Sequence, residues 1–229
     1  LFKARSSMSP PALEKMVTDT ATLKELQEAP DPPQALARIP SLTLSDIERV
    51  NKTIPLTLSE EKGCELLYHD LFTSGILYLD IGFNLYALPQ EHLPYVPLFG
   101  RALLEMGTED EDYVTLTQRI SRKTGGIRPT LFASSVKDSR QGCAWLFLRG
   151  KAMFKQTRDL LHIYQDVLLR ARLDNKERFQ QMVLEAKARL EENLVPGGHQ
   201  YVNMRLRALF SEAGWAEEQM KGLSQLFFL

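Results

Sequence analysis

The sequence has few cysteines and no long apolar run. Cys64 and Cys143 are the only cysteines among 229 residues, which excludes a disulfide-rich scaffold and favours a reducing compartment. Both stand among apolar, strand-like neighbours, so we interpret them as small buried hydrophobic residues; a disulfide between them stays open. No apolar run approaches the roughly 20 residues that cross a bilayer, and the start of the chain lacks the apolar segment of a signal peptide.

The chain also lacks a strong net charge. Its formal charge is -1 at pH 7, so no overall field draws it to nucleic acid or to an anionic membrane. We therefore expect neither nucleic-acid nor membrane partners. The hydrophobic fraction of 44% and the charged fraction of 25% are those of an ordinary globular protein, and the length allows a sizeable buried core.

Motifs that would identify a catalytic zinc site are absent from the sequence. H-E-x-x-H and H-x-x-E-H place two histidines on one helix face, where they hold one zinc ion beside a glutamate that deprotonates the bound water. No histidine here has a second histidine or a cysteine at such spacing. We therefore predict no metal site and no catalytic residue in this chain. The histidines are His69, His92, His162 and His199.

Phosphate-binding and serine-hydrolase motifs are missing as well. The segment KTGG at 123–126 has its glycines after the lysine, which is typical of a helix end and not of a phosphate-binding loop. No G-x-S-x-G sequence occurs. A local basic cluster fits either a solvated helix end or a site for a peptide carboxylate or phosphate. Its members are Arg119, Arg122, Lys123 and Arg128.

The chain divides into a short N-terminal part and a main body. Residues 11–28 have apolar side chains at helical spacing, and APDPP at 29–33 ends that helix in an extended segment. An irregular stretch follows from about 39 to 55. We place the boundary near residue 45, so residues 1–44 form a linker helix with an extended connector. Residues 45–229 then form the domain.

The main body predicts an α+β fold, with a mostly antiparallel sheet covered by helices. Residues 76–86 alternate apolar and polar side chains, as in a strand with one buried face. A short strand at 64–69 and a hairpin of 130–136 with 143–149 complete the predicted strands. The predicted helices are 93–106, which ends at Gly107; one that begins at a Thr108/Glu111 capping box; 154–171; 175–194, which begins at Asp174; 199–210; and 215–220.

Several segments together resemble one protein family. They occur in the order APDPP (29–33), PSL (40–42), SDI (45–47), YHDLFT (68–73), LPYVPLF (93–99), LLEMGT (103–108) and RKTGGI (122–127). This order is similar to the presequence protease branch of the pitrilysin/insulinase zinc metallopeptidases. The resemblance implies four related α+β domains in the whole protein, two in each half of a clamshell, with a helical hairpin that joins the two halves. This chain would be the end of that hairpin and the third, peptidase-associated domain.

The same resemblance implies a degenerate copy of the family's zinc helix. With Gly107 as the end of that helix, the positions that match the family's H, E and H are Leu98, Arg101 and Ala102. No zinc ligand remains there. We interpret Leu98 and Ala102 as packing residues and Arg101 as a solvated or chamber-facing charge. Zinc would belong to the parent enzyme and not to this chain.

We therefore expect a non-catalytic scaffold domain of a larger zinc metalloendopeptidase that degrades targeting peptides and other short unstructured peptides. Its partners would be the remaining domains of the same polypeptide and the peptide substrates. The alternative is a free-standing, degenerate peptidase-like interaction module. Both chain ends suggest a fragment, because Leu1 is no initiator methionine and the last four residues are apolar; a C-terminal strand is the other explanation. We expect a bacterial cytoplasm, with a mitochondrial or chloroplast matrix as the alternative.

Overall fold

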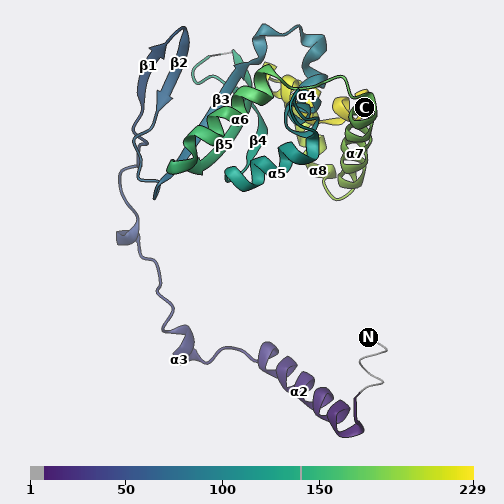
Figure 1. Ribbon diagram of the computed structural model, residues 1–229. Helices are drawn as coiled ribbons and strands as arrows, with labels where there is room; N and C mark the ends of the chain where they lie inside the picture. The colour runs from purple at the N-terminus through teal and green to yellow at the C-terminus, as the bar shows by residue number, and fades with distance from the viewer. Residues whose placement is uncertain (1–7, 140) are drawn as a thin grey trace. The chain divides into compact units, whose positions relative to one another are not determined.

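The computed structural model describes residues 8–139 and 141–229, and the chain divides into two compact units, Leu1–Asp70 and Leu71–Leu229 (Figure 1). The division falls later than residue 45, because the hairpin before Asp70 belongs to the first unit. That 1–44 is a linker stays a prediction. The first unit contains α2 (Pro10–Glu28), α3 (Pro33–Leu36), a 3-10 turn (Leu44–Asp46), β1 (Thr57–Glu61) and β2 (Cys64–Tyr68).

Helix α2 confirms the helix predicted at 11–28. Its first residue is Pro10, whose missing N–H and fixed φ suit the first helical position. Its apolar side chains find no partner within the described part of the chain: Val17 and Leu26 are each 70% exposed. An exposed apolar stripe on a helix indicates a surface that is completed by another element.

The hairpin β1–β2 contains one strand that the sequence did not predict and corrects the prediction for Cys64. The strand β1 falls just after the stretch interpreted as irregular, and it pairs with β2 through a tight turn at Lys62 and Gly63, both with positive φ. Every residue of both strands is exposed, so the prediction of a buried Cys64 is wrong. A two-stranded hairpin alone has no second layer against which to bury one face. Cys143 is half-buried, and both thiols are free.

The second unit confirms the α+β prediction. Its sheet has the antiparallel order β3-β5-β4, from β3 (Ile76–Asn84), β4 (Ile127–Ser135) and β5 (Gly142–Met153). The strands β4 and β5 are the predicted hairpin. The helices are α4 (Val96–Glu105), α5 (Tyr113–Lys123), α6 (Thr157–Leu169), α7 (Lys176–Leu194), α8 (Gly198–Arg207), α9 (Glu212–Lys221) and α10 (Leu223–Phe228). The chain therefore ends in a helix and not in a strand.

One face of the sheet forms the core with the helices. Leu148 of β5 is fully buried against Leu160 and Ile163 of α6, and α5 contributes Leu116. Burying each such side chain stabilises the fold by roughly 1.5–3 kcal/mol. Helices α4, α6 and α9 contact the strands, whereas α7 contacts α4 and α8 contacts α9. The second unit is thus a sheet with helices on one side (Figure 1).

Two predicted helix caps are not the caps found in the structure. Helix α5 begins at Tyr113, where the Asp112 carboxylate accepts a hydrogen bond from the Thr115 N–H at 2.8 Å. Thr108 is no cap, because Gly107 turns the chain with φ +89° and Thr108 then forms a bridge with Ala171. Helix α7 begins after Asn175, not Asp174; the Asn175 side chain accepts from the Arg178 N–H at 3.0 Å. Within the described residues, no helix is long and apolar enough to cross a membrane.

Candidate functional site

The three positions predicted to correspond to a zinc-binding helix, Leu98, Arg101 and Ala102, lie on α4, and two of them are in the core. Leu98 and Ala102 are buried, at 4% and 3% exposure. Ala102 packs with Met106 and with Met182 of α7. Both positions are therefore packing residues, as interpreted from the sequence.

Arg101 lies between these two in the sequence and is ion-paired rather than solvated; that it faces a chamber stays a prediction. Its guanidinium donates two hydrogen bonds to Glu105, at 3.0 and 2.7 Å, and one to Glu185 of α7 at 3.0 Å. The side chain is only 18% exposed. The Glu105 carboxylate, followed by that of Glu185, raises the pKa of Arg101, and Arg101 in turn lowers the pKa of Glu185. Two apolar side chains and an ion-paired guanidinium offer no ligand that fits zinc.

Two members of the basic cluster, Arg119 and Lys123, form ion pairs within the fold. Arg119 pairs with Asp166 at 2.8 Å and with Glu111, and Lys123 pairs with Asp159 at 3.5 Å. The pairs with Asp166 and Asp159 connect α5 to α6, and the pair with Glu111 connects α5 to the loop before it, so this part of the basic cluster is engaged within the fold. Among residues 8–139 and 141–229, no group of three or more His, Cys, Asp or Glu side chains is placed to hold a metal ion.

The sheet face opposite the helices carries a group of aromatic side chains. Strand alternation puts Trp145 and Phe147 on this face of β5, with Phe132 of β4 paired to Trp145. The Trp145 and Phe147 rings stack with centroids 5.9 Å apart, and Phe132 meets Phe147 edge-on at 6.5 Å. We call Phe132, Trp145 and Phe147 the aromatic cluster.

The lack of a side chain at Gly82 makes room for this cluster. Gly82 of β3 pairs with Phe147, and a Cβ on Gly82 would lie 2.6 Å from the Phe147 ring. The ring therefore occupies space that only glycine leaves open. Phe132 is 48% exposed and Tyr78, on the same face of β3, is 59% exposed. Trp145 and Phe147 are half-buried, so Phe132 and Tyr78 form the exposed part of this face, and apolar groups exposed side by side are typical of a binding surface.

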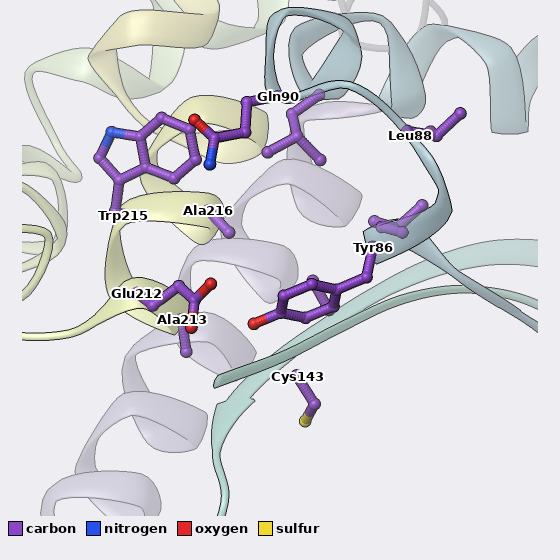
Figure 2. A pocket seen from close by; sticks show the side chains of 11 residues that line it. Tyr86, Leu88, Gln90, Cys143, Glu212, Ala213, Trp215 and Ala216 are labelled. Carbon is purple, nitrogen blue, oxygen red and sulfur yellow. The ribbon is translucent and has the colours of Figure 1, made fainter. Parts of the chain in front are cut away.

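A pocket of about 170 Å³ lies where β3 ends, β5 begins and α9 begins (Figure 2). Its walls are mostly apolar, with Leu85, Leu93 and Ala216 buried at the base. Figure 2 shows the Tyr86 hydroxyl pointing toward Glu212, with the Trp215 ring farther away beside Gln90. The remaining lining residues are Leu88, Gln90, Cys143, Ala144 and Ala213.

Two hydrogen bonds with the Gly142 backbone orient the Tyr86 and Glu212 side chains of this pocket. The Tyr86 hydroxyl donates to the Gly142 carbonyl at 3.0 Å, and the Gly142 N–H donates to Oε2 of Glu212 at 3.1 Å. Burial and the neighbouring Glu212 carboxylate raise the pKa of the Tyr86 hydroxyl. The pocket thus has apolar walls and a fixed negative charge at its opening.

Sequence reasoning missed both surfaces. The aromatic cluster had a signal, because Trp145 and Phe147 are two residues apart in a predicted strand and so share a face. The pocket had none: Tyr86 and Glu212 are distant in sequence, and only the start of α9 beside β5 brings them together.

Comparisons with known proteins agree on one family. The family model described as "Peptidase M16C associated" matches residues 1–229. The Arabidopsis thaliana "Presequence protease 1, chloroplastic/mitochondrial" is 40% identical over 229 residues, which is 100% of this chain and 21% of that protein. "Protein HypA" of Clostridium perfringens is 29% identical over 100% of this chain and 24% of its own length. The Danio rerio "Presequence protease, mitochondrial" is 26% identical over 83% of this chain and 19% of its own length.

The chain therefore spans about a fifth to a quarter of the length of these relatives. The 40% identity with the plant protein extends over the whole chain, including both compact units.

Proposed function

Because the chain belongs to the peptidase M16C associated family, we propose that it is a non-catalytic domain that forms part of the substrate chamber of a larger zinc metalloendopeptidase. The parent degrades targeting peptides and other short unstructured peptides. The other domains of the same polypeptide supply the zinc ligands and the catalytic groups. This domain contributes shape and apolar contact.

The observation that carries this proposal is the aromatic cluster on the sheet face that the helices of the second unit leave open. In this cluster Phe132 is exposed and Trp145 and Phe147 are half-buried, and a folded protein rarely exposes a large contiguous apolar patch without a partner. An extended peptide can lay apolar side chains against such a face, since flat aromatic rings offer contact area at low entropic cost. Enclosure would then favour chains short and unfolded enough to fit.

A kinetic comparison in the whole protein tests the role of the cluster. Phe132→Ala and Trp145→Ala should each raise KM for a short unstructured fluorogenic peptide by about three- to tenfold and leave kcat within about twofold, because they remove binding that ground state and transition state share. The matched control is Phe210→Ala, at a residue that is 84% exposed after α8. Equal KM values in all four proteins would refute the binding role.

A metal experiment tests the parent's chemistry separately. A chelator should abolish cleavage by the whole protein, and added zinc should restore it. The purified chain 1–229 should neither cleave the peptide nor retain stoichiometric zinc. Chelator-resistant cleavage by the whole protein would refute the zinc mechanism, and zinc-dependent cleavage by 1–229 would refute the non-catalytic role.

The cellular location remains part of the proposal. The bacterial relative supports a cytoplasmic location, and the relatives named as mitochondrial or chloroplastic support an organelle matrix. Fractionation of the source cells, with an antibody against this chain, distinguishes the two.

A further inference from the structure

The pocket between β3, β5 and α9 is separate from the aromatic cluster, and nothing so far assigns it a ligand. We propose that it binds the cationic side chain, arginine or lysine, of a peptide held in the chamber. This inference rests on the proposed function and adds a charge preference to it.

The size and lining of the pocket fit a long side chain with an apolar stem. A volume of about 170 Å³ is close to the roughly 150 Å³ cavities that hold a small aromatic molecule. Leu85, Leu93 and Ala216 form an apolar base. Arginine and lysine side chains bury their methylene stems against such surfaces and keep the charged group at a polar rim.

The rim supplies the counter-charge. Glu212 Oε2 accepts from the Gly142 N–H, which fixes the carboxylate and leaves Oε1 to accept a further hydrogen bond. Within the described residues, no lysine, arginine or histidine forms an ion pair with Glu212, and none lines the pocket. The Trp215 and Tyr86 rings also line the pocket, so a cation bound there gains from their negative faces.

Other side chains fit this site less well. An acidic side chain would meet the Glu212 carboxylate, and like charges at short distance repel. An apolar side chain would fill the base but gain nothing from the carboxylate. Targeting peptides of mitochondria and chloroplasts are rich in arginine and poor in acidic residues, so the charge preference of the pocket matches the substrate class of the proposed function.

The test compares two peptides on the whole protein. Both are unstructured and fluorescein-labelled; one contains arginines, and the other has glutamine at each arginine position. Binding is measured by anisotropy at low salt and with the catalytic metal removed, so that neither peptide is cut. The Glu212→Gln variant keeps an oxygen that can accept from Gly142 N–H and removes only the charge. Glu192→Gln on the exposed side of α7 is the matched charge control.

We expect Glu212→Gln to weaken binding of the arginine peptide by about five- to tenfold, the effect of losing one charge-assisted contact at a rim. Binding of the glutamine peptide should change less than about twofold, and Glu192→Gln should match the wild type for both peptides. Addition of 0.5 M salt should remove most of the arginine preference.

The outcomes separate this inference from the proposed function. If the wild-type protein binds and cleaves peptides but Glu212→Gln weakens both peptides equally or neither, the cation pocket is refuted and the chamber role stands. If the wild-type protein binds neither peptide, the chamber role itself is refuted. Trp215→Leu provides an independent check, because it keeps apolar area and loses the ring, and it should also lower the preference for the arginine peptide.

Discussion

The Tyr164 hydroxyl of α6 lies directly beneath Gly150 of β5. A Cβ at Gly150 would be 2.5 Å from that hydroxyl oxygen. The hydroxyl is within hydrogen-bonding distance of two strand carbonyls, of Leu79 at 2.8 Å and of Leu148 at 3.1 Å. Tyr164 is 2% exposed, and burial raises the pKa of its hydroxyl. The absent side chain of Gly150 thus lets a buried polar group reach the backbone of two adjacent strands.

This contact predicts that Gly150→Ala destabilises the fold by about 1–3 kcal/mol, the usual cost of overpacking a close-packed core. The free energy of unfolding from urea titration measures the effect. Gly198→Ala is the control, because a Cβ there has nothing within 4 Å. In the double variant with Tyr164→Phe the two losses should not add, since the phenylalanine has no hydroxyl to clash. Strictly additive losses would contradict this account.

Arg101 predicts a second stability effect. Arg101→Met should destabilise the second unit by about 0.5–1.5 kcal/mol, because it removes the short ion pairs to Glu105 and Glu185 and leaves these carboxylates only their longer pairs with Arg178, at 3.4 and 3.6 Å. Thermal unfolding provides the measurement. Arg189→Met, on the exposed side of α7, is the control and should change the unfolding temperature little. Equal effects of the two substitutions would mean that Arg101 does not hold α4 to α7.

The exposure of Cys64 predicts a chemical difference between the two cysteines. Cys64 lies on the exposed hairpin strand β2, whereas Cys143 is half-buried. Under native conditions a maleimide should modify Cys64 well before Cys143, since access limits thiol reactions. Peptide mass mapping over time gives both rates, and Cys64→Ser should remove the fast phase. Equal rates at the two sites would indicate that the hairpin is covered or that β5 opens readily.

Local sequence signals predicted most of the elements, because strand alternation and helix ends depend on neighbouring residues. The alternation of apolar and polar residues at 76–86 predicted β3, and Gly107 predicted the end of α4. The sequence could not show which of two adjacent residues caps α7, because Asp174 and Asn175 are equally good helix caps. In the structure the cap is Asn175.

Contacts between distant segments had no such signal. Arg101 and Glu185 are 84 residues apart, and nothing near either residue indicates the other. The same holds for the pocket that Tyr86 and Glu212 share. Burial of a charge follows from the packing of whole helices. The sequence alone therefore predicted a solvated or chamber-facing Arg101, whereas in the structure α7 covers it.

From the contacts of the buried Glu218 carboxylate we predict how the stability of the fold depends on pH. It is 1% exposed on α9, and its Oε1 accepts from Arg205 of α8 and from the Ser224 N–H of α10, both at 3.0 Å. Burial alone would raise the pKa of this carboxyl, but the hydrogen bonds from Ser224 and Arg205 outweigh burial and lower it below the ordinary value of 4.5. The folded state therefore binds this proton less readily than the unfolded state.

A group with a lowered folded pKa stabilises the fold above its unfolded pKa and loses that contribution as the pH falls through the folded pKa. Glu218→Gln should therefore lower the free energy of unfolding at pH 7 by about 1–3 kcal/mol, and the gap to the wild type should narrow below pH 4.5. Urea titrations between pH 3 and pH 7 give both curves. Glu192→Gln, at an exposed site on α7, should follow the wild-type curve. A gap that stays constant to pH 3 would mean that Glu218 stabilises the α8–α9–α10 packing through its shape and not through its charge.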